Sequence, residues 1–201
     1  MRNGLITLAY VLCVFSAPCQ QLTQQERELV LSMLEENSNK FLADIEKVSD
    51  TQWRYKPSTS QWSIAEIAEH ITLSDGLLLS IAQNSLKSPA DDEKANGLTG
   101  KENSMIERLK DRAQKAHAPD VLVPTNRYAS RKDLIAAFKI AREKTIMYVK
   151  HSKDPLKNHI ASHPLFGELT AYQWLVMIPA HANRHVAQLE DVMTLKEFPA
   201  E

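Results

Sequence analysis

Residues 170–195 read TAYQWLVMIPAHANRHVAQLEDVMTL, and they have the pattern of one long amphipathic helix. Thr170 followed by Gln173 is a capping box, in which each side chain bonds the backbone N–H of the other residue. Apolar side chains then recur at helical spacing and form one face, made of Trp174, Ile178, Leu189 and Val192. We expect a helix from Thr170 to about Leu195, with Pro179 either bending it or accommodated by packing.

Three further segments combine helical periodicity with a Ser or Thr cap that is followed by an acid. The pairs are Thr23 with Glu26, Ser63 with Glu66, and Ser130 with Asp133. We expect these helices to end near Ser49, near Lys87 and before Asp154. Because the same start signal occurs four times in front of helical periodicity, the sequence predicts four long helices.

Residues 88–129 interrupt this pattern with prolines, glycines and acids. We expect a loop, then a short exposed helix from Glu102 to about Ala116, then an extended return from Pro119 to Tyr128. The chain has 5 glycines in 201 residues and no β-alternation of useful length, which disfavours a β-rich fold. The sequence therefore predicts an all-α fold, a four-helix bundle with one long crossover between its second and third helices.

The N-terminus has the layout of a secretory signal peptide. Arg2 precedes an apolar run over residues 5–15, and small residues follow it up to Cys19. The run is too short to span a membrane. We expect residues 1–19 to be removed, so that residues 20–201 form the mature domain and the protein is secreted or periplasmic. Lipoprotein processing at Cys19 is the alternative, although the residues before it fit that signal poorly.

The composition narrows the range of partners. Lysine plus arginine number 24 against 25 acidic residues, and no basic block stands out, so we expect no nucleic-acid partner. Both cysteines, Cys13 and Cys19, belong to the signal region, and we expect no disulfide in the mature chain. One domain, stabilised by packing and without a membrane span, accounts for the remaining length. The expected partner is an unidentified small-molecule substrate, and pairing into a homodimer stays open.

His181 and His185 lie about 40° apart around the helix axis and about 6 Å apart along it, so both can reach one metal ion. Both fall on the apolar face, where an unpartnered imidazole costs about 1–3 kcal/mol. No glutamate follows the first histidine, which excludes the H-E-x-x-H arrangement of zinc proteases. His70 lies two turns into the helix that starts at Ser63, where a structural role and a ligand role both remain open.

The segment from Trp62 to Ile71, together with His181-Ala-Asn-Arg-His185 and the following Gln188, resembles the DinB-like family of small helical metalloenzymes. That family is also called DinB/YfiT-like. The resemblance covers most of the mature chain and implies a four-helix bundle. It further implies that His70, His181 and His185 form a site for a divalent ion, usually zinc or nickel, near one end of the bundle. The signal peptide departs from the family's usual cytoplasmic setting.

Three neutral imidazoles leave a coordination position open for water, and a bound dication lowers the pKa of that water to about 7. This chemistry favours a secreted metal-dependent hydrolase that acts on a small substrate. Two alternatives remain. One is a non-catalytic metal- or ligand-binding module, and the other is a thiol-dependent transferase, against which the export signal counts because low-molecular-weight thiols are kept reduced inside cells.

The general base is unknown. Glu66 is a candidate because it lies one turn before His70, but its place in the capping box explains it equally. Asp75 falls on an apolar face, where a link to a neighbouring helix is the simpler explanation. His159 and His163 lie in a segment expected to be a loop, where they either line the mouth of the site or are solvated. His117 and His151 have polar neighbours, and we assign them no role.

Overall fold

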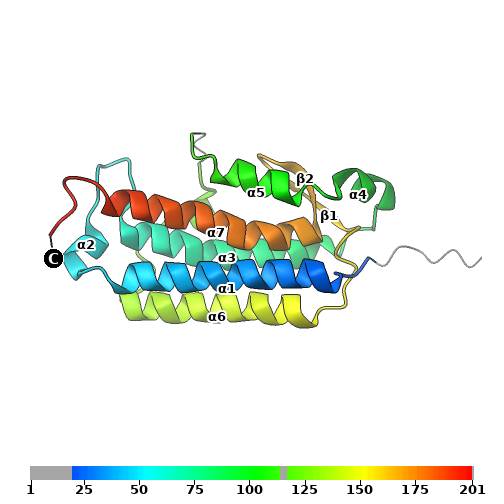
Figure 1. The fold of residues 1–201 in the computed structure, drawn as a ribbon, viewed down its shortest axis with the longest axis horizontal. Coiled ribbons are helices and arrows are strands. Elements are labelled where there is room, and N and C mark those ends of the chain that lie inside the picture. The colour runs from blue at the N-terminus through cyan, green and yellow to red at the C-terminus, as the bar shows by residue number, and fades with distance from the viewer. Residues whose placement is uncertain (1–19, 114–116, 201) are drawn as a thin grey trace, which may run out of the picture.

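Four long helices begin directly after the four predicted caps in the computed structural model, which describes residues 20–113 and 117–200 (Figure 1). They are α1 (Gln24–Glu46), α3 (Ile64–Ser85), α6 (Arg131–His151) and α7 (Ala171–Met193). Complete capping boxes form at Thr23, Ser63 and Thr170. At Ser130 only half of the box forms, because the shorter side chain of Asp133 bonds the Ser130 hydroxyl and not its backbone N–H.

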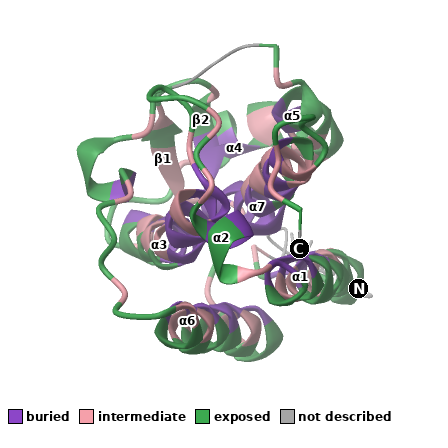
Figure 2. Cartoon of the chain, turned by 90° about the vertical axis from the view of Figure 1, so that its left-hand side faces the viewer, coloured by how far each residue is buried: buried purple, intermediate pink, exposed green. Residues whose placement is uncertain are grey.

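The four helices lie side by side as a bundle (Figure 1), and their buried residues face its interior (Figure 2). α7 packs against both α3 and α1, and α6 packs against the same two helices from the other side. The long segment between α3 and α6 is the predicted crossover. The prediction of an all-α four-helix bundle is therefore confirmed, and the two helices that carry the three histidines of interest are neighbours.

A polar network, buried except at the exposed Asn183, links the four helices. On α3, Asp75 forms an ion pair with Arg142 of α6, whose Nε lies 2.8 Å from Asp75 Oδ2. Arg142 also donates to Asn37 of α1 at 2.9 Å, and Asn37 donates to Asn183 of α7 at 2.7 Å. Asp75, Arg142 and Asn37 are each at most 3 % exposed. Asp75 is thus the interhelical link that its buried position suggested.

The crossover contains more structure than the sequence pattern revealed. It holds α4 (Asp92–Leu98), α5 (Glu102–Lys110) and a single 3₁₀ turn, η1 (Asp120–Leu122). α5 begins where predicted, but it ends at Lys110 and not near Ala116. The segment around α4 was expected to be a loop. Its start is marked by Asp91, whose carboxylate accepts from the backbone N–H of Lys94 at 3.0 Å.

The first predicted helix is also divided. α1 ends at Glu46, and a short helix, α2 (Asp50–Arg54), follows with its own capping box made by Ser49 and Gln52. The cap at Ser49 lies at the position where the sequence predicted the end of a single helix.

A β-hairpin corrects the expectation that residues 158–167 form a loop. β1 (Ile160–His163) pairs antiparallel with β2 (Gly167–Thr170). Each strand has only four residues, which is too short for a recognisable alternation of apolar and polar side chains. Gly167 adopts a φ of 72°, a left-handed conformation that suits glycine, where the second strand begins. The hairpin leads directly into α7, and Trp174 Nε1 donates to the Ala161 carbonyl at 3.2 Å.

Within the part of the chain that the structure describes, no helix combines the length and apolar character needed to cross a membrane. The predicted signal peptide, residues 1–19, lies outside the described residues.

The buried ion pair gives a stability prediction. Arg142→Met should lower the free energy of unfolding by about 3–5 kcal/mol, because it leaves the Asp75 carboxylate buried without its partner. The double variant Asp75→Leu with Arg142→Met should lose less, since it removes both charges. Urea denaturation measures both changes. Exposed Arg54→Met is the control, and a loss at Arg142 no larger than that at Arg54 would contradict the prediction.

Candidate metal centre

Three imidazoles converge between α3 and α7. His70 comes from α3, His181 and His185 come from α7, and one ring nitrogen of each lies within 4.8 Å of the others. The Nε2 atoms of His181 and His185 are 3.2 Å apart, and the ring centroid of His70 lies 4.4 Å from that of His185. This is the one cluster of three or more possible ligand side chains among residues 20–113 and 117–200.

The packing of the two helices explains why the rings meet. The neighbouring residues Ile67, Ile71, Ala182 and Val186 are all buried in the apolar core. These side chains fix the rotation of α3 and α7 about their axes, so the histidines on the same faces point into the contact between the helices. His70 is 2 % exposed.

Hydrogen bonds at the outer ring nitrogens orient two of the imidazoles. His70 Nδ1 lies 2.9 Å from the Leu122 carbonyl oxygen, and His185 Nδ1 lies 2.9 Å from Gln188 Oε1. Both partners are oxygens that accept, so each neutral ring carries its proton on Nδ1 and has a lone pair on Nε2. Such a bond at the far side of the ring is the usual support of a metal-ligating histidine.

The inner nitrogens fit a metal ion. His70 Nε2 is buried and has no hydrogen-bond partner among the described residues. The outer nitrogen of His181, Nδ1, is also buried without such a partner, so this ring lacks the support that the other two have. The two closest Nε2 atoms are 3.2 Å apart, and two imidazole nitrogens at about 2.1 Å from one metal ion are separated by about 3.0–3.4 Å. The donor set and its spacing therefore fit one divalent cation, and metal binding itself stays a prediction.

All three rings are held neutral at pH 7. Burial lowers the pKa of His70. Burial, and then repulsion from the protonated forms of His185 and His70, lowers the pKa of His181 well below its usual range. Burial and the charge of His70 lower the pKa of His185 to about 3. Neutral imidazole is the form that binds metals, so protons do not compete for these nitrogens near neutral pH.

Trp62 and the end of the crossover enclose the cluster. The ring centroid of Trp62 lies 4.9 Å from that of His70 and 6.4 Å from that of His185. Next to His70, the buried carboxylate of Glu69 accepts from the backbone N–H groups of Thr125 and Arg127 at 2.9 and 3.3 Å. Glu69 therefore fixes the same crossover segment that orients His70 through its backbone carbonyl.

Sequence reasoning missed two parts of this arrangement. The Leu122 carbonyl is a backbone group from a distant segment, so no residue type marks it. Glu69 lies on a buried part of its helix, which could have indicated a structural role for its carboxylate. Its partners are backbone groups of a distant segment, so no nearby residue identifies them. Trp62, which the family resemblance did single out, has its ring against two of the histidines.

The candidate general base, Glu66, has a structural role. Glu66 Oε2 accepts from the backbone N–H of Ser63 at 2.7 Å, and Oε1 lies 2.7 Å from Lys56 Nζ. The capping box therefore accounts for one of its oxygens and the ion pair with Lys56 for the other. Asp75 is bound by Arg142 and is not part of the cluster.

The other histidines lie outside the cluster. His159 Nδ1 is 2.9 Å from the carbonyl oxygen of Ser88, just beyond the end of α3 that is distant from His70, so it does not line the site. His163 packs against Trp174 and Phe166 in the hairpin. Trp174 precedes His181 on α7 by about two helical turns, so His163 lies beside the same helix but outside the cluster. His117 and His151 are exposed.

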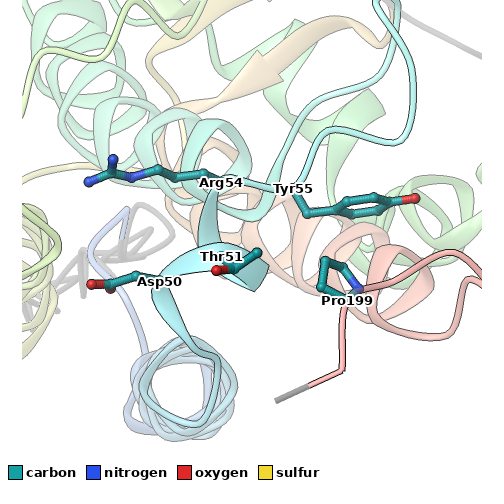
Figure 3. Close-up of a pocket in the computed structure, with 5 residues that line it drawn as sticks. All are labelled: Asp50, Thr51, Arg54, Tyr55 and Pro199. Carbon is teal, nitrogen blue, oxygen red and sulfur yellow. The ribbon is translucent and has the colours of Figure 1, made fainter.

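A hollow of about 370 Å³ at the α2 end of the bundle is separate from this cluster (Figure 3). Its lining residues are Asp50, Thr51, Arg54, Tyr55 and Pro199. None of them is one of the three histidines, and Asp50 is bound by Arg131 at 2.8 Å. We therefore place the candidate chemistry at the histidines and not in the hollow.

Comparisons with known proteins agree with this geometry. A sequence model of the DinB superfamily matches residues 33–189, a range that contains all three histidines. The uncharacterized protein YuaE of Bacillus subtilis (strain 168) is 28% identical over 149 residues, which are 74% of this chain and 88% of YuaE. The solved structure of YfiT from Bacillus subtilis superposes with a TM-score of 0.57 at 15% identity, covering 89% of this chain and 91% of YfiT. YfiT is described as a probable metal-dependent hydrolase with an unusual four-helix bundle topology.

The histidine environments predict how stability changes with pH in the metal-free protein. The folded-state pKa of His185 is about 3 and its unfolded value is 6.5, so the unfolded chain takes up a proton first as the pH falls. The free energy of unfolding should therefore decrease below about pH 6.5, by about 1.4 kcal/mol per pH unit for each such histidine.

Urea denaturation of the metal-free protein at several pH values between 7 and 4 measures this slope. His185→Gln should make the slope shallower, while His117→Gln, at an exposed position, should leave it unchanged. An equal slope in the wild type and in His185→Gln would show that this ring is not held neutral by its surroundings.

Proposed function

This chain belongs to the DinB superfamily, and we propose that it is a metal-dependent hydrolase whose His70, His181 and His185 hold one divalent ion. The observation that carries the proposal is the convergence of three neutral imidazoles, two of them oriented by hydrogen bonds at the far ring nitrogen. The description of YfiT as a probable metal-dependent hydrolase supports the same reaction class for a protein of this fold.

A divalent ion in such a site supplies a water of lowered pKa, about 7, and thereby a nucleophile near neutral pH. The chain's own residues prepare the site for it. The Leu122 carbonyl and the Gln188 side chain hold the rings of His70 and His185 with Nε2 facing inward. Burial keeps these rings unprotonated, and Trp62 limits access of solvent to them.

Imidazole ligands suit zinc and nickel, and we propose one of these as the ion, with a small molecule as the substrate. A non-catalytic metal- or ligand-binding module is the second candidate. The observation that favours it is that Glu66, the acid considered as general base, is already bound at both oxygens. A thiol-dependent transferase is a third and less favoured reading, because the proposed export removes the chain from the reducing cytoplasm.

Metal binding is the first test. The protein, stripped of metal and titrated with zinc or nickel, should bind one ion per chain. Alanine at any of His70, His181 or His185 should weaken binding sharply, because each removes one ligand. Gln188→Ala should weaken it by about 10–100-fold, since the ring of His185 loses its support.

His117→Ala is the matched control and should bind the ion as the wild type does. Equal metal content in the wild type and in the triple histidine variant would overturn the site. Metal-dependent turnover of small esters, amides or phosphoesters would support the hydrolase. Stoichiometric metal without turnover of any of them would support the binding module.

We also propose that the protein is exported and that residues 1–19 are its signal peptide. The support is the basic, apolar and small-residue layout at the N-terminus. N-terminal sequencing of the protein from the extracytoplasmic fraction should find a chain that begins near Gln20. A cytoplasmic protein that retains its N-terminal apolar run would refute the proposal, and a lipid-modified Cys19 would replace it with the lipoprotein alternative.

A further inference from the structure

A second cavity lies beside the helices that cover α7. It measures about 200 Å³ and is bordered by the end of α4, by α5, by β2 and by the first turn of α7. Figure 1 shows α5 lying along α7 with the hairpin beside it. None of the three clustered histidines lines this cavity, so it is a separate feature of the molecule.

One wall of the cavity is positively charged. Lys101, directly before α5, and Ser104 and Arg108 of α5 follow one another at intervals of three and four residues, so all three lie on the same side. The guanidinium of Arg108 lies over the ring of Phe166, 4.8 Å from its centroid, which holds this cation at the cavity wall.

The nearby acids form no ion pair with the two cations of this wall. Glu168 also lines the cavity, but its carboxylate is paired with Lys94 at 3.0 Å. Glu107 of α5 is paired with Lys110 at 2.6 Å. Glu102 accepts from the neutral amide of Gln173 at 2.9 Å. Among the described residues, no carboxylate lies within ion-pair distance of Lys101 or Arg108, so both charges are available to a ligand.

The positive charge is also felt by a neighbouring ring. The pKa of His163 is lowered, first by burial and then by the charge of Arg108. Arg108 therefore lies close enough to His163 to disfavour the protonated ring.

The remainder of the lining sets the shape of the ligand. Leu98, Met105 and Leu169 are apolar lining residues, and Met105 and Leu169 belong to the buried core. A volume of about 200 Å³ lies below the roughly 300–1,000 Å³ of sites for drug-sized ligands, so it suits a smaller molecule. Positive charge on one wall and apolar surface on another favour a ligand that is an amphipathic anion.

We propose that this cavity binds a small organic carboxylate with an apolar body. The carboxylate is received by Arg108 and Lys101, with the Ser104 hydroxyl as an additional donor, and the apolar body lies against Met105 and Leu169. Arginine is suited to this role because its planar fork of N–H groups matches the two carboxylate oxygens. The proposal does not depend on a metal at the histidine cluster.

Isothermal titration of the mature protein with sodium hexanoate tests the site. Metal ions are first removed with a chelating resin, so that the carboxylate cannot bind to an ion at the histidines. Hexanoate should bind saturably with a dissociation constant in the millimolar range or tighter. Hexanol, which lacks the charge, and inorganic phosphate, which lacks the apolar body, should each bind at least tenfold more weakly.

Substitutions locate the binding. Arg108→Gln and Lys101→Gln should each weaken hexanoate binding at least tenfold, whereas Lys110→Gln on the same helix, whose partner is Glu107, should not change it. Circular dichroism spectra of the three variants show whether the fold is retained. Wild-type affinity in Arg108→Gln, equal binding of hexanol, or no saturable binding of hexanoate would each overturn the proposal. The metal content of Arg108→Gln should match that of the wild type, which separates this result from the histidine site.

Discussion

The ion pair between Asp75 and Arg142 fixes how the four helices face one another. A buried carboxylate without its partner is so costly that α3 and α6 must meet with these side chains opposed. The buried Asn37 extends the constraint to α1, and its bond to the exposed Asn183 reaches α7 at the surface. His70 lies five residues before Asp75, and His181 lies two residues before Asn183, so each histidine is turned well away from the network on its helix. With the polar network directed to the α1 and α6 side, the histidines are left to face each other between α3 and α7.

Most of the bundle could be predicted from the sequence because its signals are local. A cap such as Thr170 with Gln173 involves residues three positions apart, and the apolar stripe behind it belongs to a single helix. The pairing of His181 with His185 is local for the same reason. The position of His70 opposite them is not local, since it depends on α3 and α7 being neighbours. Only the resemblance to the DinB-like family joined the three residues before the structure placed them together.

The parts that could not be predicted depend on distant partners. The hairpin consists of two four-residue strands that are stabilised by pairing with each other and by the Trp174 indole. The turn at Leu122 is held by Glu69 and His70, which lie more than 50 residues earlier in the chain. The division of the first helix is an instructive exception, because Ser49 and Gln52 form an ordinary capping box. There the signal was local, but it coincided with the expected end of the preceding helix.

The acids of α3 show what kind of chemistry the site can support. Glu66 holds the start of the helix, Glu69 holds the crossover segment, and Asp75 holds α6. Each has a structural partner, so withdrawing any of them to accept a proton would loosen an element that positions His70 or its surroundings. The site therefore keeps three imidazoles neutral and fixed, and in the proposed hydrolase the acidity of water on a bound ion would take the place of a general base. A substrate that carries its own proton acceptor, or a reaction that needs none, fits this arrangement better than one that depends on a carboxylate of the protein.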